Sequence, residues 1–326
     1  MIISRTPLRI SFFGGGTDIK DFYEKEGGAV LSAAIDKYIY ATVNRKFDDQ
    51  IRISYSKTEI VAAIDEVKHE LVREAMKHTG IVKGIEITTI SDIPSHGTGL
   101  GSSSTFTVGI LHALHAYRGE HASAETLAKE ACMIEIDMVK EPIGKQDQYI
   151  AAYGGLQFIQ FNKDGSVYID PIVCSSEMKE ELQNNLMLFY TGMTRRASTI
   201  LSEQKANSSN NKLSELRSLK ALAYEAKRML ERGRSMEEFG RLLDEGWRIK
   251  RSLASGISNN EIDQMYGIAK KAGALGGKIA GAGGGGFLLL CVPENRRESV
   301  RNALSGLKEV RLKIEPQGSK IIHVSD

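Results

Sequence analysis

Residues 94–105 read Pro-Ser-His-Gly-Thr-Gly-Leu-Gly-Ser-Ser-Ser-Thr, and this stretch organises the interpretation of the whole chain. It follows a strand-like run at 84–90 and precedes a helical pattern that begins near Ser103. A glycine-rich turn between a strand and a helix N-terminus is an arrangement that binds phosphate, because the first helical N–H groups lack partners. The stretch contains no lysine and is therefore not a Walker A loop. An ordinary turn with a serine N-cap is the alternative, but three glycines and three serines favour an anion site.

The composition indicates a globular protein with room for two domains. The chain has 326 residues, of which 41% are hydrophobic and 26% charged, with a formal net charge of +2. Such a balance gives no electrostatic reason to expect nucleic acid or a membrane as a partner. Cys132, Cys174 and Cys291 lie too far apart for a metal pair or a disulfide framework, which suits a reducing compartment. With no signal-peptide pattern and no membrane-length apolar run, we expect a cytoplasmic protein.

The first half of the chain mixes strand and helix patterns. Strands are predicted at 1–13, 29–43, 51–55, 84–90, 156–161 and 167–169, and helices at 66–78, from about 103 to 114 and at 123–138. Asp18 is expected to cap a short helix through Phe22 and Tyr23, and Ser123 to cap the helix that contains Glu135. The segment 141–148 is expected to be a loop that ends that helix.

The second half is predicted to form a separate domain. Helices are expected over most of 197–252 with a loose stretch at 207–211, and at 261–271 and 296–307, with strands at 186–190, 287–292, 310–314 and 320–324. A polar stretch at 175–179 places the boundary, giving domains 1–178 and 179–326. Antiparallel-looking strands interleaved with helices favour an α+β fold over a doubly wound parallel sheet.

A second glycine cluster lies at 273–286. Gly281, Gly283 and Gly286 match the spacing of a dinucleotide-binding fingerprint, but the run leads into a strand rather than from a strand into a helix. We therefore reject the dinucleotide interpretation. A tight turn with close packing between domains is one explanation. We favour a main chain that lies against phosphate or substrate, because consecutive glycines carry an entropic cost that a simple turn does not need.

Several charged side chains are candidates for chemistry. Asp147 could accept or orient a hydroxyl proton, although with Lys145 it could equally form a surface pair. Glu135 beside a phosphate site becomes a candidate Mg²⁺ ligand, whereas alone it would be an ordinary helix carboxylate. Arg9 lies on a strand that approaches the first glycine cluster, so its cation could reach a transferring phosphoryl group.

The remaining candidates carry weaker patterns. Arg195 and Arg196 follow a predicted strand and could bind an acidic substrate group, although paired surface arginines are common. His96 lies in the phosphate loop and could contact substrate. His112 and His115 are interpreted as structural and Trp247 as a core residue.

Three motifs, taken together, carry a family resemblance. They are residues 7–18 (Pro-Leu-Arg-Ile-Ser-Phe-Phe-Gly-Gly-Gly-Thr-Asp), residues 94–105, and residues 278–289 (Lys-Ile-Ala-Gly-Ala-Gly-Gly-Gly-Gly-Phe-Leu-Leu). In this order they resemble the GHMP kinases, which include galactokinase, homoserine kinase and mevalonate kinase. The resemblance implies a two-domain α+β fold with a ferredoxin-like C-terminal domain and the active site in the cleft between the domains. It also implies that ATP and Mg²⁺ are used.

The resemblance also implies roles for single residues. The ATP phosphates would be held by Gly97, Thr98, Gly99, Leu100, Gly101, Ser102, Ser103 and Ser104. By position, Ser103 and Glu135 would bind Mg²⁺, Asp147 would be the catalytic aspartate and Arg9 the cation beside it. Asp18 matches the sugar-binding aspartate of galactokinase-like members.

Departures from the family pattern narrow the choice of acceptor sugar. Galactokinase carries Gly-Glu-His-Thr-Asp where this chain has Gly-Gly-Gly-Thr-Asp at 14–18, which argues against galactose. That form, with Gly-Lys-Gln-Asp-Gln at 144–148 and Tyr-Thr-Gly-Met-Thr-Arg at 190–195, looks most like the D-glycero-D-manno-heptose 7-phosphate kinases of bacterial surface-polysaccharide synthesis. The expected reaction moves the γ-phosphate of ATP to the anomeric O1 of that sugar, for nucleotide-activated heptose.

The substrate-binding set and the alternatives follow from this expectation. The set consists of Gly15, Gly16, Thr17, Asp18, His96, Lys145, Arg195, Arg196, Gly283 and Gly284, with the 7-phosphate held by Lys145 and the two arginines. One alternative is a kinase for L-fucose or another free sugar. A non-enzymatic alternative is a sugar and nucleotide sensor, whose expected mark is a damaged catalytic set. The oligomeric state is left open.

Overall fold

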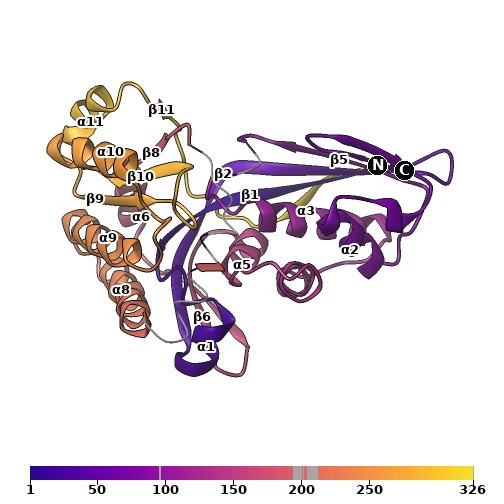
Figure 1. The fold of residues 1–326 in the computed structure, drawn as a ribbon, viewed down its shortest axis with the longest axis horizontal. Coiled ribbons are helices and arrows are strands. Elements are labelled where there is room, and N and C mark those ends of the chain that lie inside the picture. The colour runs from indigo at the N-terminus through magenta and orange to yellow at the C-terminus, as the bar shows by residue number, and fades with distance from the viewer. Residues whose placement is uncertain (95–96, 194–199, 201, 204–211, 326) are drawn as a thin grey trace.

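The computed structural model describes residues 1–94, 97–193, 200, 202–203 and 212–325. These residues form two lobes, each with its own sheet and helices (Figure 1). The first lobe has strands β1 (Ile2–Phe13), β2 (Gly28–Arg45), β3 (Ile51–Ser54), β4 (Thr58–Val61), β5 (Ile85–Ser91), β6 (Leu156–Phe161), β7 (Val167–Pro171) and β12 (Lys320–Val324). Its helices are α1 (Lys20–Glu26), η1 (Ile64–Glu66), α2 (Glu70–His78), α3 (Ser102–Tyr117), α4 (Ala124–Cys132), the π-helical η2 (Met133–Met138) and α5 (Gln146–Tyr153).

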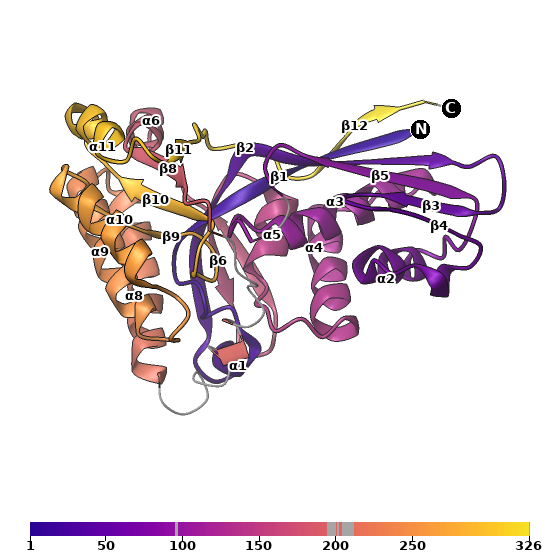
Figure 2. The same cartoon turned by 45° about the horizontal axis from the view of Figure 1, so that its top comes forward.

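The second lobe is smaller and mostly helical. Its strands are β8 (Leu186–Tyr190), β9 (Gly276–Ile279), β10 (Phe287–Cys291) and β11 (Lys308–Glu309). Its helices are α6 (Ser176–Asn184), α8 (Leu213–Glu231), α9 (Met236–Arg251), α10 (Asn260–Lys271), η3 (Glu294–Arg296) and α11 (Arg297–Ala303). Helices α8 and α9 lie side by side along the outer face of this lobe (Figure 2).

The long strand β2 determines the shape of the first sheet. Its first half pairs with β6 and its second half with β5, while β1 runs antiparallel along nearly its whole length. The sheet therefore divides along β2, with the order β12-β1-β2-β5-β3-β4 on one path and β6 and β7 on the other. All pairings are antiparallel except β3 with β5. This sheet, together with the antiparallel order β11-β8-β10-β9 in the second lobe, confirms the α+β prediction.

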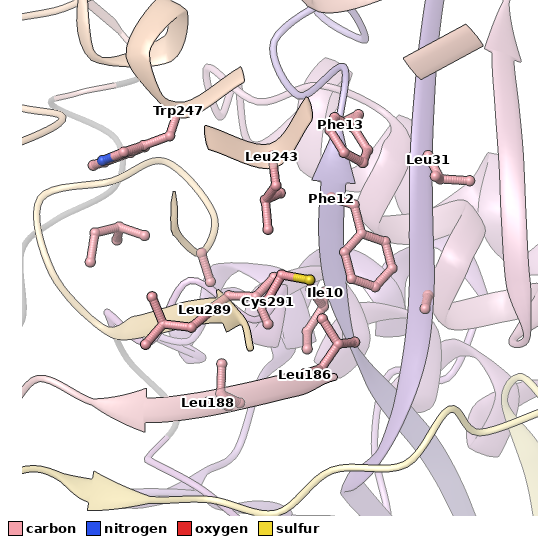
Figure 3. Close-up of a cluster of buried hydrophobic side chains, with 14 of the residues drawn as sticks. Ile10, Phe12, Phe13, Leu31, Leu186, Leu188, Leu243, Trp247, Leu289 and Cys291 are labelled. Atoms are coloured by element: carbon pink, nitrogen blue, oxygen red, sulfur yellow. The ribbon is translucent and has the colours of Figure 1, made fainter. Parts of the chain in front are cut away.

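The end of β1 is buried on both faces because the second lobe covers it. The Phe12 and Phe13 rings both pack edge-on against Phe239 of α9, with centroids 5.5 and 5.3 Å away. Figure 3 shows these two phenylalanines facing Leu243 of the same helix. One hydrophobic core thus joins the lobes at this point. Because side chains alternate along a strand, Arg9 and Ser11 share a face, and the core holds the backbone that carries them.

The chain returns to the first lobe at its end. Strand β12 pairs with the outer edge of β1, so that both described ends of the chain lie together (Figure 2). The second sheet therefore uses strands from 186 to 309 and not the last strand. Division of the chain between residues 178 and 179 stays a prediction.

Four local predictions are wrong. Asp18 does not cap α1; the N-cap is Ile19, and the Asp18 carboxylate instead accepts from Gly16 N–H and Gln146. The expected loop at 141–148 ends in α5, so Asp147 lies in a first helical turn. The strand expected at 310–314 is absent from the described fold: β11 ends at Glu309, and only an isolated bridge joins Ile314 to Ile35.

The fourth error is the start of a helix beside the first sheet. The helix expected at 66–78 does not run unbroken: η1 ends at Glu66 and α2 begins only at Glu70. Within α2, Val72, Ala75 and Met76 are buried, and Leu71 is only half buried. The helix expected at 123–138 is capped by Ser123 as predicted but becomes π-helical at Met133. In this turn Glu135 is fully buried, whereas Met138 is exposed.

Candidate active site

The loop between β5 and α3 has the backbone of an anion site. Gly97, Gly99 and Gly101 all have positive φ, at 69°, 74° and 76°. Gly101 is the N-cap of α3, and no side chain caps that helix end. The three serines are therefore not N-caps, and the first N–H groups of α3 remain available to an anion. His96 lies outside the described residues.

The second glycine cluster packs on this loop. A Cβ on Gly99 would lie 2.2 Å from the Ala280 carbonyl oxygen, and one on Gly286 would lie 2.3 Å from that of Thr98. Such distances leave room only for hydrogen, so glycine is required at both positions. Gly283 and Gly284 instead contact Ile257, and Gly284 N–H donates to its carbonyl. Their substrate-binding role stays a prediction, and the structure places them outside the acceptor pocket described below.

Arg9 and Asp147 form a bidentate ion pair under the loop. Arg9 Nε and Nη2 donate to the two Asp147 carboxylate oxygens at 2.7 and 2.6 Å. Arg9 Nη1 also donates to the Gly99 carbonyl, and Arg9 N–H to that of Leu100. The arginine is almost fully buried, whereas the Asp147 side chain is 22% exposed. The pair therefore links the phosphate loop to a carboxylate that a ligand can reach.

Glu135 is completely buried beside the first turn of α3. Its carboxylate accepts from the Ser103 hydroxyl at 2.9 Å, from the Thr107 hydroxyl at 3.2 Å, and from the Gln148 amide. Burial raises the pKa of Glu135 to about 7, and these donors oppose the rise. The hydrogen bond between Ser103 and Glu135 makes the two predicted metal ligands neighbours, and their role as ligands stays a prediction.

The donor set at Glu135 and Ser103 fits Mg²⁺ better than a transition metal. A carboxylate and a hydroxyl supply oxygen ligands, and Mg²⁺ normally completes its shell with water and phosphate oxygens. In the described residues no group of three or more His, Cys, Asp or Glu side chains could hold a metal ion. A metal ion at this site would therefore need further oxygen ligands from the phosphates of a bound nucleotide.

A small pocket lies in front of the ion pair, between the lobes. Its walls include Arg9, Ser11, Gly15, Gly16, Asp18, Gly144, Gln146, Asp147, Lys250 and Gly281. Asp18 is buried, and desolvation together with the nearby Asp147 charge raises its pKa. A Cβ on Gly144 would lie 2.0 Å from Asp18 Oδ2, so glycine at 144 makes room for this carboxylate. We call this cavity the acceptor pocket.

Of the predicted substrate residues that the structure describes, only Gly15, Gly16 and Asp18 line the acceptor pocket. The Thr17 hydroxyl donates to the Gly14 and Ala29 carbonyls, which is a structural role. Lys145 points away, with its amine 3.0 Å from the Gly165 carbonyl oxygen and above the Tyr23 ring. The paired arginines at 195 and 196 lie outside the described residues.

Sequence reasoning missed three polar side chains of the acceptor pocket. They are Ser11, Gln146 and Lys250. Ser11 lies two residues after Arg9 on the same face of β1, and Gln146 is adjacent to Asp147. Their closeness in sequence to these two candidates could have identified them. Lys250, near the end of α9, gave no such signal, because a lysine in an amphipathic helix is normally on its solvent face.

A second, larger pocket of about 370 Å³ lies on the other side of the phosphate loop. It is lined by residues of β5, by the start of α3 including Ser102 and Ser103, and by Tyr55, His69 and Phe106. The His69 ring stacks on Phe106 with centroids 4.8 Å apart. Apolar and aromatic walls next to a phosphate site suit a flat heterocycle.

Comparisons with known proteins identify the family of this chain. Residues 60–155 match the GHMP kinases N terminal domain, and residues 212–308 match the GHMP kinases C terminal domain. The chain belongs to the GHMP kinase family. The predicted family and its two-domain α+β fold are thereby confirmed. As a member of this family the chain is a kinase that uses ATP, and its similarity to heptose kinases places it among the sugar kinases of the family.

Individual relatives of this GHMP kinase cover nearly the whole chain. The D-glycero-alpha-D-manno-heptose 7-phosphate kinase of Campylobacter jejuni subsp. jejuni serotype O:2 is 32% identical over 319 residues, which is 93% of each chain. The solved structure of a D-glycero-D-manno-heptose 1-phosphate kinase from Bacteriodes thetaiotaomicron is 25% identical, covers 100% of each chain and has a TM-score of 0.83. The L-fucokinase/L-fucose-1-P guanylyltransferase of Bacteroides fragilis is 27% identical, and the match covers only 35% of that protein. In the described part of this kinase, no helix is long and apolar enough to span a membrane.

Proposed function

We propose that this kinase transfers the γ-phosphate of ATP to the anomeric hydroxyl of D-glycero-D-manno-heptose 7-phosphate. The observation that carries the proposal is the Arg9–Asp147 pair, which connects the phosphate loop to the acceptor pocket. The 32% identical relative named for that sugar phosphate supports the choice of acceptor. Glycine at 15 and 16 leaves that pocket free of bulky side chains on this wall.

The residues divide the work of transfer in this proposal. Main-chain N–H groups of residues 97–104 bind the ATP phosphates, and the pocket of about 370 Å³ takes the adenine. Asp18 fixes a sugar hydroxyl through its buried carboxylate. Asp147 orients the acceptor hydroxyl and takes its proton, while Arg9 offsets charge on the phosphoryl group. Mg²⁺, held by Ser103 and Glu135 together with ATP, would neutralise phosphate charge.

Positioning accounts for most of the rate in such a reaction, since phosphoryl transfer needs little covalent help from the protein. An assembled catalytic set argues against the sensor alternative, because Arg9, Asp147, Ser103 and Glu135 are all intact and paired. The fucokinase relative keeps a free-sugar acceptor as the second candidate.

One assay separates these candidates. ADP release is measured with ATP and Mg²⁺ over free sugars, sugar 6-phosphates and heptose 7-phosphate. We expect the highest kcat/KM with heptose 7-phosphate. A higher kcat/KM for a free sugar such as L-fucose would overturn the acceptor assignment, and nucleotide binding without ADP release with any sugar would favour the sensor.

A further inference from the structure

Lys250 brings a buried ammonium group into the acceptor pocket from the second lobe. The residue lies near the end of α9 and is only 6% exposed. Its Nζ donates to the Gly281 carbonyl oxygen at 2.5 Å. It lines the same pocket as Asp18 and Asp147. A lysine at this place needs an explanation, because burying a charged amine is unfavourable unless it is paired.

Within the described residues, only part of the hydrogen-bonding capacity of this ammonium group is used. An ammonium has three N–H donors, and Gly281 takes one of them. The two nearby carboxylates bond elsewhere: Asp147 pairs with Arg9, and Asp18 accepts from Gly16 and Gln146. Lys250 therefore keeps donor capacity toward the pocket.

A second polar group in the same pocket is also left without a partner. The Ser11 hydroxyl is buried and makes no hydrogen bond, on a side chain that is 4% exposed. A Cβ placed on Gly15 would lie 3.6 Å from Ser11 Oγ, 3.6 Å from Gln146 Nε2 and 3.8 Å from Lys250 Nζ. The three polar groups thus border the open side of Gly15, where no side chain separates them. Convergent unsatisfied polar groups indicate where a polar ligand atom binds.

We propose that Lys250 is a further catalytic residue, whose ammonium donates to the acceptor hydroxyl oxygen in front of Gly15. The proposal rests on the sugar kinase function and not on which sugar is the acceptor. In the transfer step the acceptor oxygen forms its bond to the γ-phosphorus and its proton passes to Asp147. The bond from phosphorus to the bridging oxygen breaks, and its electron pair leaves with ADP. Lys250 keeps its proton and stabilises the negative charge on the acceptor oxygen.

A purely structural role is the competing explanation, in which Lys250 only holds the loop at Gly281. The two roles differ in their pH dependence. Burial and the Arg9 charge lower the pKa of Lys250 to about 8, whereas Asp18 and Asp147 act in the opposite direction. Lys278 of β9 is the other buried cation that faces it, and its own amine donates to the Ser11 and Phe12 carbonyls.

The catalytic role predicts an alkaline limit on activity. In the free enzyme the ammonium is lost as pH rises through about 8, so kcat/KM for the sugar falls above that pH. An arginine keeps its charge across this range and removes the limit. A structural hydrogen bond to Gly281 would give no such change, because a neutral amine donates as well.

The test compares Lys250→Met, Lys250→Arg and the control Arg248→Gln, which removes a charge from the exposed face of the same helix. ADP release is measured from pH 6.5 to 9.5 with the sugar that the wild type turns over fastest, and affinity for the ATP analogue AMPPNP is measured by calorimetry. We expect Lys250→Met to lower kcat about 10²-fold, as for loss of one transition-state donor, with AMPPNP affinity unchanged within about twofold. Lys250→Arg should recover part of the rate and lose the alkaline limit, and Arg248→Gln should behave like the wild type.

Three results would overturn the proposal. One is wild-type turnover in Lys250→Met. Another is a fall in AMPPNP affinity as large as the fall in kcat, which would place Lys250 on the nucleotide. The third is an alkaline limit that Lys250→Arg leaves in place, and this variant decides the matter if Lys250→Met does not fold. Failure of the kinase function itself would appear separately, as no ADP release from the wild type with any sugar, and would remove both proposals.

Discussion

The α-carbon of Gly99 lies 2.6 Å from the point that a Cβ on Gly281 would occupy. The phosphate loop of one lobe and the glycine loop of the other therefore touch through main chain alone. Gly281 also supplies the carbonyl that binds Lys250, so this contact connects the nucleotide side of the site with the acceptor side.

We expect Gly281→Ala to weaken nucleotide binding, because the added methyl group must push the phosphate loop away. The predicted result is a rise of at least tenfold in the KM for ATP. Gly119→Ala is the matched control, since it has a similar φ of +75° against +68° but nothing within 4 Å of the new methyl group. Both changes share the left-handed backbone strain of about 1–2 kcal/mol. An equal KM for ATP in the two variants would show that strain, and not the loop contact, is responsible.

Replacement of Asp147 tests the other side of the site. Asp147→Asn keeps the shape of the side chain but removes the carboxylate that pairs with Arg9 and faces the acceptor pocket. We expect kcat to fall about 10²–10⁴-fold, the usual contribution of a positioned base, while AMPPNP affinity survives. Asp170→Asn, which breaks a partly exposed pair with Lys227, is the control and should leave turnover unchanged. Normal turnover in Asp147→Asn would remove this residue from the mechanism.

Glu135 should make the stability of the metal-free protein depend on pH. Its pKa is about 7 in the folded state against 4.5 as the ordinary value, so the folded protein binds the extra proton between these pH values. This contribution to stability is complete below pH 4.5 and is lost as pH rises through 7. We expect the Tm of the wild type without Mg²⁺ to fall between pH 5.5 and 8 relative to Glu135→Gln, whose amide does not titrate.

In the difference in Tm between the wild type and Glu135→Gln, the contributions of other titrating groups cancel. Asp18 also has a raised pKa and contributes in the same direction, but it is present in both proteins. A difference in Tm that stays constant from pH 5.5 to 8 would mean that Glu135 is ionised throughout. Addition of Mg²⁺ and ADP is expected to stabilise the wild type more than the variant, because ligand binding to the folded state raises Tm.

The sequence predicted best what depends on local backbone. The glycines at 97, 99 and 101 predicted the phosphate loop correctly, because glycine alone adopts positive φ readily and all three do so. The strand expected at 310–314 failed for a tertiary reason. Val310, Leu312 and Ile314 alternate because they pack against the hydrophobic core, and apart from the single bridge at Ile314 the segment forms no strand. The π-helical turn at 133–138 likewise leaves no mark in the residue pattern.

Residues brought together over long sequence distances were the hardest to predict. Ser11, Gln146 and Lys250 come from a strand, a helix start and a helix end that meet only in the folded protein. Family resemblance paired Ser103 with Glu135, which lie 32 residues apart, but periodicity alone would not have done so. Lys250 lies outside the three motifs, so neither route could find it.

Gly15 offers the sharpest test of where the acceptor binds. Its φ is outside the left-handed region, and a new Cβ would make only ordinary contacts of 3.6–3.8 Å with Ser11, Gln146 and Lys250. Gly15→Ala should therefore fold like the wild type, with its methyl group crowding the space in front of Gly15 that is assigned to the acceptor hydroxyl. We expect kcat/KM for the sugar to fall at least tenfold with AMPPNP affinity unchanged. Neighbouring Gly14→Ala should instead lose folded protein, because its Cβ would lie 1.9 Å from the Ala29 carbonyl oxygen; an active Gly15→Ala with unaltered kcat/KM would place the acceptor elsewhere.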